Sequence, residues 1–344
     1  MIALTSMVAV TGGSIRFTSM IALTSMIALT FLIAITGGSI RLTSMIALTS
    51  DIAEFFSHWP VIAICALCVI CGPLGHWRKD FIDELVGSVI MIVTLFPAGI
   101  WVGTGGHWQA CGWHAGGVVL ADWISGGPHV NPTVSLTMLA LGKLRYPEFL
   151  CRVSAQLAGG VLTFPICRWF AKMFELPMFG GPTFDPAKVS LAAALWDEGV
   201  ATFILCCAIF LLNWELPVRK NYLAKQSLTA AVIRFNIEMF CSSGCAMNPM
   251  IGTCWAIFLS SEAEGGRYAF PGDSSHYWCY WIAGFTGALL ASLFYSLCSG
   301  TQFFGWKLQS RAKSEKRISR STLVQCTGIE FWGPMRLRLL TIIG

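Results

Sequence analysis

The chain has 344 residues, of which 55% are hydrophobic and only 12% are charged, and its mean hydropathy is +0.65. Soluble domains carry about 25% charged residues, so this composition excludes an ordinary soluble protein and indicates one that crosses the membrane several times. The net charge of +5 does not indicate a nucleic-acid partner, because the basic residues stand beside apolar segments.

The first 50 residues repeat themselves. The run Ser-Met-Ile-Ala-Leu-Thr begins at Ser19, Ser25 and Ser44. We interpret residues 1–50 as a low-complexity extension with no part in the chemistry. A targeting segment is the alternative, because this stretch is apolar, rich in Ser and Thr, and free of acidic residues.

The next segment, residues 51–79, contains an apolar run from Trp59 to Gly75 that is short for a membrane span. We expect it to form an additional membrane or interfacial helix ahead of the main body.

A regular pattern of long apolar runs and short polar loops begins near residue 80. Helix is the expected structure, because backbone groups in lipid must be satisfied within their own segment. We therefore predict an all-α membrane domain over residues 80–300 and a basic cytoplasmic tail over residues 301–344. The six predicted spans are residues 81–101, 108–124, 149–171, 189–213, 222–241 and 277–299.

Two Asn-Pro pairs open apolar runs that are too short to cross a membrane. Asn is a strong helix N-cap, and Pro is favoured at the first helical position, where its missing N–H costs nothing. We predict two half-length helices, at about 131–142 and 248–260. The two motifs are Asn131-Pro132-Thr133 and Asn248-Pro249-Met250.

The two halves of the domain resemble each other. Glu84 precedes Asn131 by 47 residues, and Glu198 precedes Asn248 by 50 residues. With three spans in each half, the second half enters the membrane in the opposite orientation, which predicts an inverted repeat with its site at the midplane. Lys and Arg are concentrated in the loops and tail that are cytoplasmic if both termini are cytoplasmic, which favours that orientation.

These features together resemble the aquaporin, or major intrinsic protein, family over about residues 80–300. The resemblance implies six spans, two re-entrant half-helices and a homotetramer with one pore in each subunit. It also implies that Glu84 and Glu198 are buried carboxylates that bind the backbone of the re-entrant loops. The motifs that carry it are the openings at Glu84 and Glu198, Ser125-Gly126-Gly127-Pro128-His129-Val130-Asn131-Pro132-Thr133, Gln156-Leu157-Ala158-Gly159, Gly244-Cys245-Ala246-Met247-Asn248-Pro249 and His276-Tyr277-Trp278-Cys279-Tyr280-Trp281.

The chain departs from the family pattern in and beside both motifs. Thr133 and Met250 stand where Ala is usual, and Ile251 stands where the family has the Arg of its outer constriction. These departures resemble the unorthodox branch of the family, sometimes called superaquaporins.

The chemistry expected of the two Asn residues is hydrogen-bond donation to a solute in single file. Their side-chain oxygens are held at the helix caps, which aims the amide N–H groups of Asn131 and Asn248 at the passing molecule. Each half-helix places about half a positive charge at its N-terminus, so cations meet a barrier and neutral solutes do not. The alternative is that both motifs merely cap buried helices.

Counting from the motifs places the outer constriction near Cys111, Asn236, Cys245 and Ile251. This set is smaller and less polar than a ring of Arg, His and aromatic residues. We therefore expect a wider mouth that admits glycerol, hydrogen peroxide or ammonia besides water.

Arg234 is unusual because an Arg at membrane depth is costly and faces the protein interior or water. It either pairs structurally with Glu238, four residues later, or reaches the vestibule and partly replaces the missing constriction Arg. His129 is expected to pack or form a hydrogen bond in its loop, and Gln156 is expected to have a structural role. The sequence predicts no catalytic set, metal site or cofactor.

The expected function is a passive channel for water and small uncharged solutes in a lipid bilayer. A non-conducting scaffold or adhesion protein with the same fold is the main alternative, because Met250 and Ile251 are bulky. A coupled transporter is a third, since broken helices and inverted repeats also occur there.

Overall fold

The computed structural model describes residues 58, 78–96, 107–173, 180–262 and 267–307, without the side chains of 107–111 and 169–173. The chain divides into two compact units, residues 1–56 and 57–344, and all the described residues belong to the second. The predicted extension over residues 1–50, nearly all of the apolar segment 51–79 and most of the tail 301–344 lie outside the described residues.

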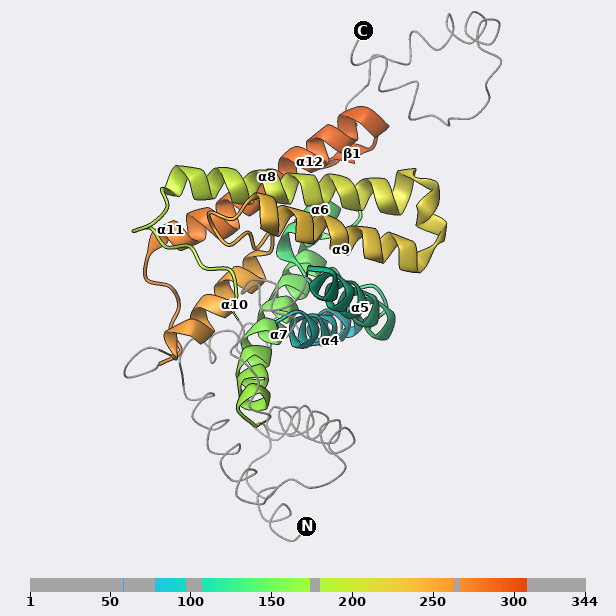
Figure 1. The fold of residues 1–344 in the computed structure, drawn as a ribbon. Helices are drawn as coiled ribbons and strands as arrows, with labels where there is room; N and C mark the ends of the chain where they lie inside the picture. Colours follow the sequence, from blue (N-terminus) through green and yellow to red (C-terminus); the bar gives the residue numbers. More distant parts are fainter. Residues whose placement is uncertain (1–57, 59–77, 97–106, 174–179, 263–266, 308–344) are drawn as a thin grey trace, which may run out of the picture. The chain divides into compact units, whose positions relative to one another are not determined.

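The described part is built from helices, with a two-stranded hairpin near its C-terminal end (Figure 1). The first half contains α4 (Arg78–Leu95), α5 (His107–Ser125), α6 (Pro132–Ala140) and α7 (Tyr146–Met173). The second half contains α8 (Leu191–Phe210), a π-helical turn (Leu211–Glu215), a 3-10 turn (Pro217–Lys220), α9 (Tyr222–Met239), α10 (Pro249–Ser260), α11 (Ser274–Tyr277), a second π-helical turn (Trp278–Ala283) and α12 (Gly284–Ser299). The hairpin pairs β1 (Gln302–Phe303) with β2 (Trp306–Lys307).

Each of the six predicted spans overlaps one of the long helices, and the two half-length helices are α6 and α10. Three described helical segments are long and apolar enough to cross a membrane: Tyr146–Arg168, Leu191–Glu215 and Ser274–Ser299. The helix α4 is less apolar because its first two turns carry five charged residues, from Arg78 to Glu84. The prediction of an all-α membrane domain is confirmed.

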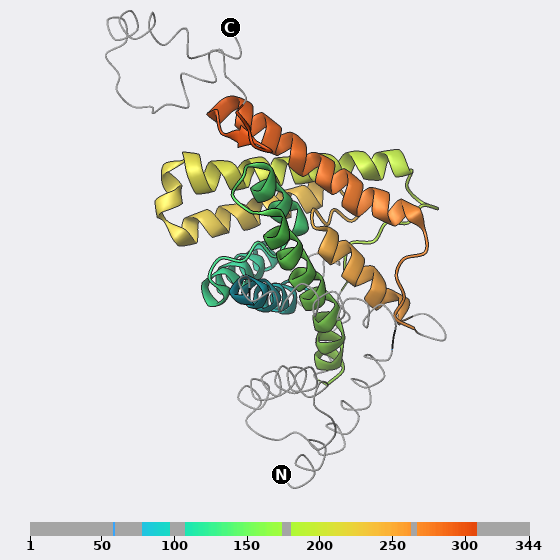
Figure 2. The ribbon, with the colours of Figure 1, turned by 180° about the vertical axis from the view of Figure 1, so that it is seen from behind.

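Each helix contact described here for the first half has a counterpart in the second half. The first helix of each half packs against the last helix of the same half, as α4 does on α7 and α8 does on α12. Each half-helix packs on the last helix of the other half, so that α6 lies on α12 and α10 on α7. Figures 1 and 2 show α4 beside α5 and α8 beside α9. These contacts with the opposite half hold both half-helices at the centre of the described part.

The α8–α12 crossing depends on a glycine. A Cβ atom built at Gly287 would lie 2.2 Å from the backbone oxygen of Gly199, a distance that no side-chain adjustment relieves. Gly116 on α5 is the opposite case, because a Cβ there meets nothing within 4 Å.

We expect Gly287→Ala to destabilise the protein by about 1–3 kcal/mol, because the helices must separate. Gly116→Ala should instead stabilise it by about 0.5–1 kcal/mol, since Ala restricts the unfolded chain. Thermal unfolding of both variants in detergent measures the two effects. Equal changes in the unfolding temperature of the two variants, in the same direction, would contradict a close crossing of α8 and α12 at Gly287.

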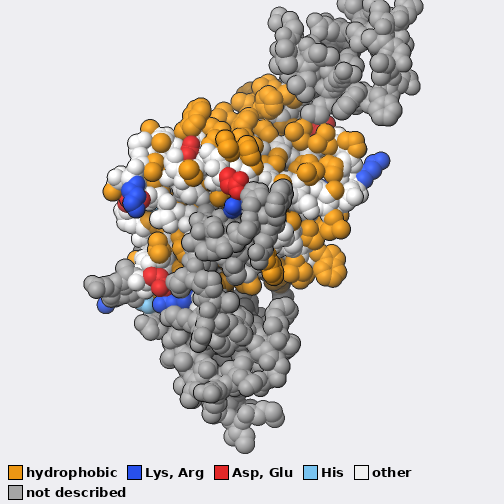
Figure 3. Space-filling view, viewed as in Figure 1, with side chains coloured by type: hydrophobic (Ala, Val, Ile, Leu, Met, Phe, Trp, Pro, Cys, Tyr) orange, Lys and Arg blue, Asp and Glu red, His pale blue; other side chains and the backbone are white. Residues whose placement is uncertain are grey.

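The exposed surface of the helices is strongly apolar. Hydrophobic side chains cover the region over α8 and α12, and charged groups are sparse there (Figure 3). Trp196, Phe294 and Leu290 are each more than half exposed. Such a surface suits contact with lipid rather than water.

Candidate functional site

The two Asn-Pro motifs form the expected helix caps. Asn131 is extended and its Oδ1 accepts a hydrogen bond from the Thr133 N–H at 2.9 Å. Asn248 is also extended, and its Oδ1 accepts from the Met250 N–H at 3.1 Å. Pro132 and Pro249 occupy the first helical positions, where no N–H is needed.

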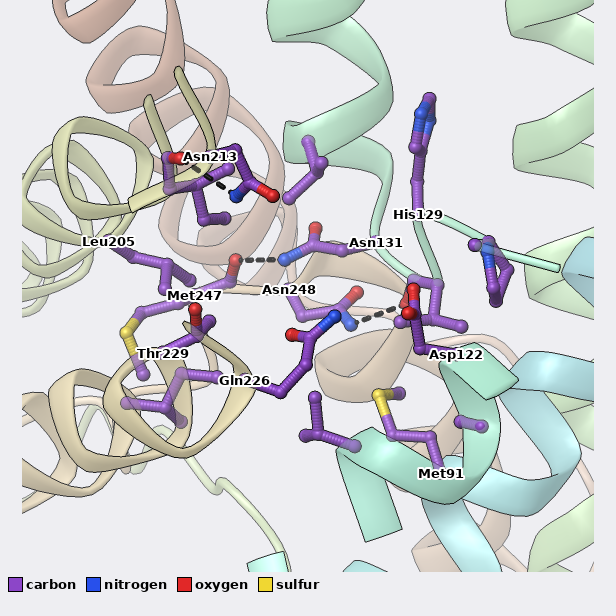
Figure 4. Close-up of a pocket in the computed structure, with 18 of the residues that line it drawn as sticks. Met91, Asp122, His129, Asn131, Leu205, Asn213, Gln226, Thr229, Met247 and Asn248 are labelled. Atoms are coloured by element: carbon purple, nitrogen blue, oxygen red, sulfur yellow. Dashed lines mark hydrogen bonds between the residues drawn. The ribbon is translucent and has the colours of Figure 1, made fainter. Parts of the chain in front are cut away.

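The same Asn side chains also join the two halves of the protein. The Nδ2 of Asn131 donates to the carbonyl of Met247, and the Nδ2 of Asn248 donates to the carbonyl of Val130, both at 2.9 Å (Figure 4). Val130 and Met247 have φ angles of 50° and 51°, a left-handed conformation that turns each carbonyl toward the opposite motif. The N-termini of α6 and α10 are therefore linked directly.

Two buried glutamates hold the loops that precede the half-helices. Glu84 accepts hydrogen bonds from the backbone N–H groups of His129 and Val130, each at 2.8 Å. Glu198 accepts from the N–H groups of Ala246 and Met247 in the second loop. Both carboxylates are fully buried. The two carboxylates thus accept hydrogen bonds from backbone N–H groups of strained loops, which have no partner within a regular helix.

The surroundings of the two glutamates differ in charge. The Nη1 of Arg152 lies 2.9 Å from Glu84, and the same guanidinium lies 2.5 Å from Asp80 and 3.0 Å from Glu148. At Glu198 the third hydrogen bond comes instead from the neutral hydroxyl of Ser243, at 2.9 Å.

Sequence analysis did not identify Arg152, although a signal was present. Glu148, Arg152 and Gln156 are spaced by four residues, which places three polar side chains on one face of α7. Gln156 completes this face, since its Nε2 donates to Glu84 at 2.8 Å and to Ser135 at 3.1 Å.

A cavity of about 420 Å³ lies where the two half-helices meet. Asn131 and Asn248 both line it, and Figure 4 shows their amides at its centre. The wall also includes His129, whose Nδ1 lies 3.1 Å from the Ser135 hydroxyl. The cavity thus brings together the two motifs that are 117 residues apart in the sequence.

The residues predicted for the outer constriction do not all line this cavity. Ile251 lines it, whereas Asn236, Cys245 and Arg234 are not among its lining residues. Asn236 is buried and donates to the Ala201 carbonyl at 2.9 Å, and Cys245 is completely buried. The side chain of Cys111 lies outside the described residues.

Arg234 forms an ion pair with Glu238 at 2.9 Å on α9. Its neighbour Ile233 lines the cavity instead. This placement matches the structural pair that the spacing of four residues suggested.

The unusual third residues of the motifs lie away from the cavity. Thr133 is buried, and its hydroxyl lies 2.8 Å from the Oδ1 of Asn131 and 3.2 Å from the Met247 carbonyl. Met250 is also fully buried and packs against α7, where a Cβ at Gly160 would lie 2.7 Å from its Sδ. Neither bulky side chain narrows the described cavity.

Comparison with known proteins identifies relatives over the same region. A family profile described as "Major intrinsic protein" matches residues 42–295. Human aquaporin-9 is 27% identical over 201 residues, which cover 52% of this chain and 65% of that protein, slightly less than two thirds of its length. A probable aquaporin PIP2-8 of Oryza sativa subsp. japonica is 26% identical over 243 residues, covering 65% and 83% of the two chains.

A solved structure has the same fold. The aquaglyceroporin of Plasmodium falciparum aligns with a TM-score of 0.54 and 22% identity, covering 64% of this chain and 95% of its own. Its helical arrangement agrees with the one described above.

Proposed function

Because this chain belongs to the major intrinsic protein family, we propose that it is a passive transmembrane channel for water and small neutral solutes. The observation that carries this proposal is the pair of capped half-helices whose Asn131 and Asn248 amides line one cavity. A side-chain amide has two N–H donors. In each Asn one donor is used in the cross-link, which leaves the other for a passing molecule.

Electrostatics favour uncharged solutes in this arrangement. The N-termini of α6 and α10 each contribute about half a positive charge, and both face the same region. A cation or a proton entering the cavity is repelled by the two together, while a neutral molecule still receives hydrogen bonds. Asn131 and Asn248 thus act as donors at the selective centre.

The outer mouth is proposed to be wider than that of a strict water channel. Ile251 lines the cavity at the position where the family pattern has an Arg, and it offers neither charge nor hydrogen bond. Glycerol, hydrogen peroxide and ammonia are the neutral solutes that such a mouth would admit besides water.

The corresponding helix contacts of the two halves support an inverted repeat. The concentration of Lys and Arg in one set of loops and in the tail supports an orientation with both termini in the cytoplasm. By the family resemblance, the assembly would be a homotetramer in which each subunit has its own pore.

Flux in proteoliposomes tests this function. We expect purified protein to conduct water and glycerol, and Ile251→Arg to lower glycerol permeability at least tenfold relative to water, because a charged, longer side chain narrows the mouth. Ile251→Val is the matched control and should leave the ratio unchanged. Water flux without glycerol or peroxide flux in the unmodified protein would contradict the wide mouth, and no flux at all would favour the scaffold alternative.

A further inference from the structure

A second histidine lines the cavity besides His129. His114 lies on α5, is 1% exposed and lines the same cavity as the two motif asparagines. It follows Cys111 by three residues in the sequence.

The ring of His114 is incompletely satisfied by the protein. Its Nδ1 is buried and has no hydrogen-bond partner among the described residues. Two other histidines that the structure describes do have partners: the half-buried His129 bonds Ser135 and the buried His276 bonds Thr253, at 3.1 and 3.3 Å. A buried polar atom without a partner is costly, so native proteins place water or a ligand beside it.

The cavity wall around His114 contains both apolar and polar side chains. Val118 lies one turn further along α5, and α4, which packs on α5, contributes Met91. The helix α9, which also packs on α5, contributes Ile233 and three polar residues, Lys225, Gln226 and Thr229. The next polar lining residue on α5 is Asp122, eight residues away, or about 12 Å along the helix. On α5, His114 is therefore about two turns away from the next described polar side chain that a solute in the cavity could bond.

We infer that His114 is a specificity-determining residue, which forms a hydrogen bond with neutral solutes as they approach the Asn pair. A neutral imidazole offers one donor and one acceptor, so it favours molecules that both donate and accept, such as water and glycerol. Ammonia is a weaker donor than water or glycerol, so it gains less from the acceptor nitrogen of the ring. This inference rests on the proposed channel function.

The test compares water and ammonia permeabilities of proteoliposomes that contain the full chain, normalised to folded protein by size-exclusion chromatography. His114→Leu keeps a similar volume and removes both hydrogen-bonding atoms. We expect water permeability to fall three- to tenfold and ammonia permeability to fall less, so that the ammonia-to-water ratio rises. His114→Gln, which restores a donor and an acceptor, should return the ratio toward that of the unmodified protein.

His276→Leu is the matched control, because His276 is buried and bonded but does not line the cavity. It should leave the ratio unchanged even if less protein folds. An unchanged ratio in His114→Leu, or the same change in His114→Gln, would overturn the inference while leaving the channel function intact. If His114→Leu does not fold, His114→Phe provides the same comparison. Absence of flux in the unmodified protein would reject the channel function itself.

Discussion

Replacing Asn248 by Ala is expected to lower water permeability about tenfold and the free energy of unfolding by about 2–3 kcal/mol. The loss of one hydrogen bond of about 1.4 kcal/mol to the passing water corresponds to a tenfold change in rate. The stability loss has two parts, the N-cap of α10 and the bond to the Val130 carbonyl. Each part contributes about 1 kcal/mol or more.

Asn131→Ala should lower the free energy of unfolding by less than Asn248→Ala does, although the two motifs look alike in the sequence. The Met247 carbonyl, which accepts from Asn131, also lies 3.2 Å from the Thr133 hydroxyl. When Asn131 is removed, this hydroxyl loses its alternative acceptor and donates to Met247. Addition of Thr133→Ala to Asn131→Ala should then reproduce the larger stability loss of Asn248→Ala.

Stopped-flow light scattering of proteoliposomes and thermal unfolding in detergent measure these effects. Asn213→Ala is the matched control, because Asn213 lines the same cavity but donates to the Ile209 carbonyl of its own helical segment at 2.8 Å. Its effects should be small. An Asn131→Ala variant that is less stable than Asn248→Ala would contradict the role assigned to Thr133.

Removal of Arg152 is the second large effect. Arg152→Ala should lower the free energy of unfolding by about 3–5 kcal/mol, because it leaves the fully buried Glu84 beside Asp80 and Glu148 without a cation. Arg152→Lys should recover only part of this loss, since a single ammonium group does not reproduce the planar fork that contacts three carboxylates.

Thermal unfolding in detergent again measures the effect, with Arg168→Ala as control. Arg168 pairs with Glu262 at 2.6 Å, but both side chains are about a quarter exposed. Its removal should therefore cost less than about 1 kcal/mol. Equal losses in the two variants would contradict the importance of burial at Arg152.

The sequence was sufficient to predict the helices and the central motifs for physical reasons. Apolar runs must be helical in lipid, and Asn-Pro fixes a helix start to within one residue, so α6 and α10 begin where the pattern predicts. It was less predictable which side chains outside the two motifs point toward the cavity. Counting positions from the motif placed Cys245 at the mouth. The direction of the backbone at Cys245 is set by a φ of 46°. Such an angle cannot be predicted from the spacing of apolar residues in the sequence.

Long-range partners were also beyond sequence reasoning. The contact between Arg152 and Glu84 joins residues 68 positions apart. The unpartnered Nδ1 of His114 depends on which side chains the helices packed on α5 place beside it. Thr133 is recognisable in the sequence only as a departure from the usual Ala, whereas its hydroxyl lies beside the cross-link between the halves. These features arise from tertiary packing, not from local preference.

The cross-link between the motifs has a consequence for biosynthesis. Asn131 finds its carbonyl partner 116 residues later in the chain, at Met247. At about 5–20 residues per second, a ribosome needs roughly 6–23 s to synthesise that stretch. During this interval the first half is in the membrane with its re-entrant segment incomplete, so the nascent chain depends on the translocon or on chaperones until the second half arrives.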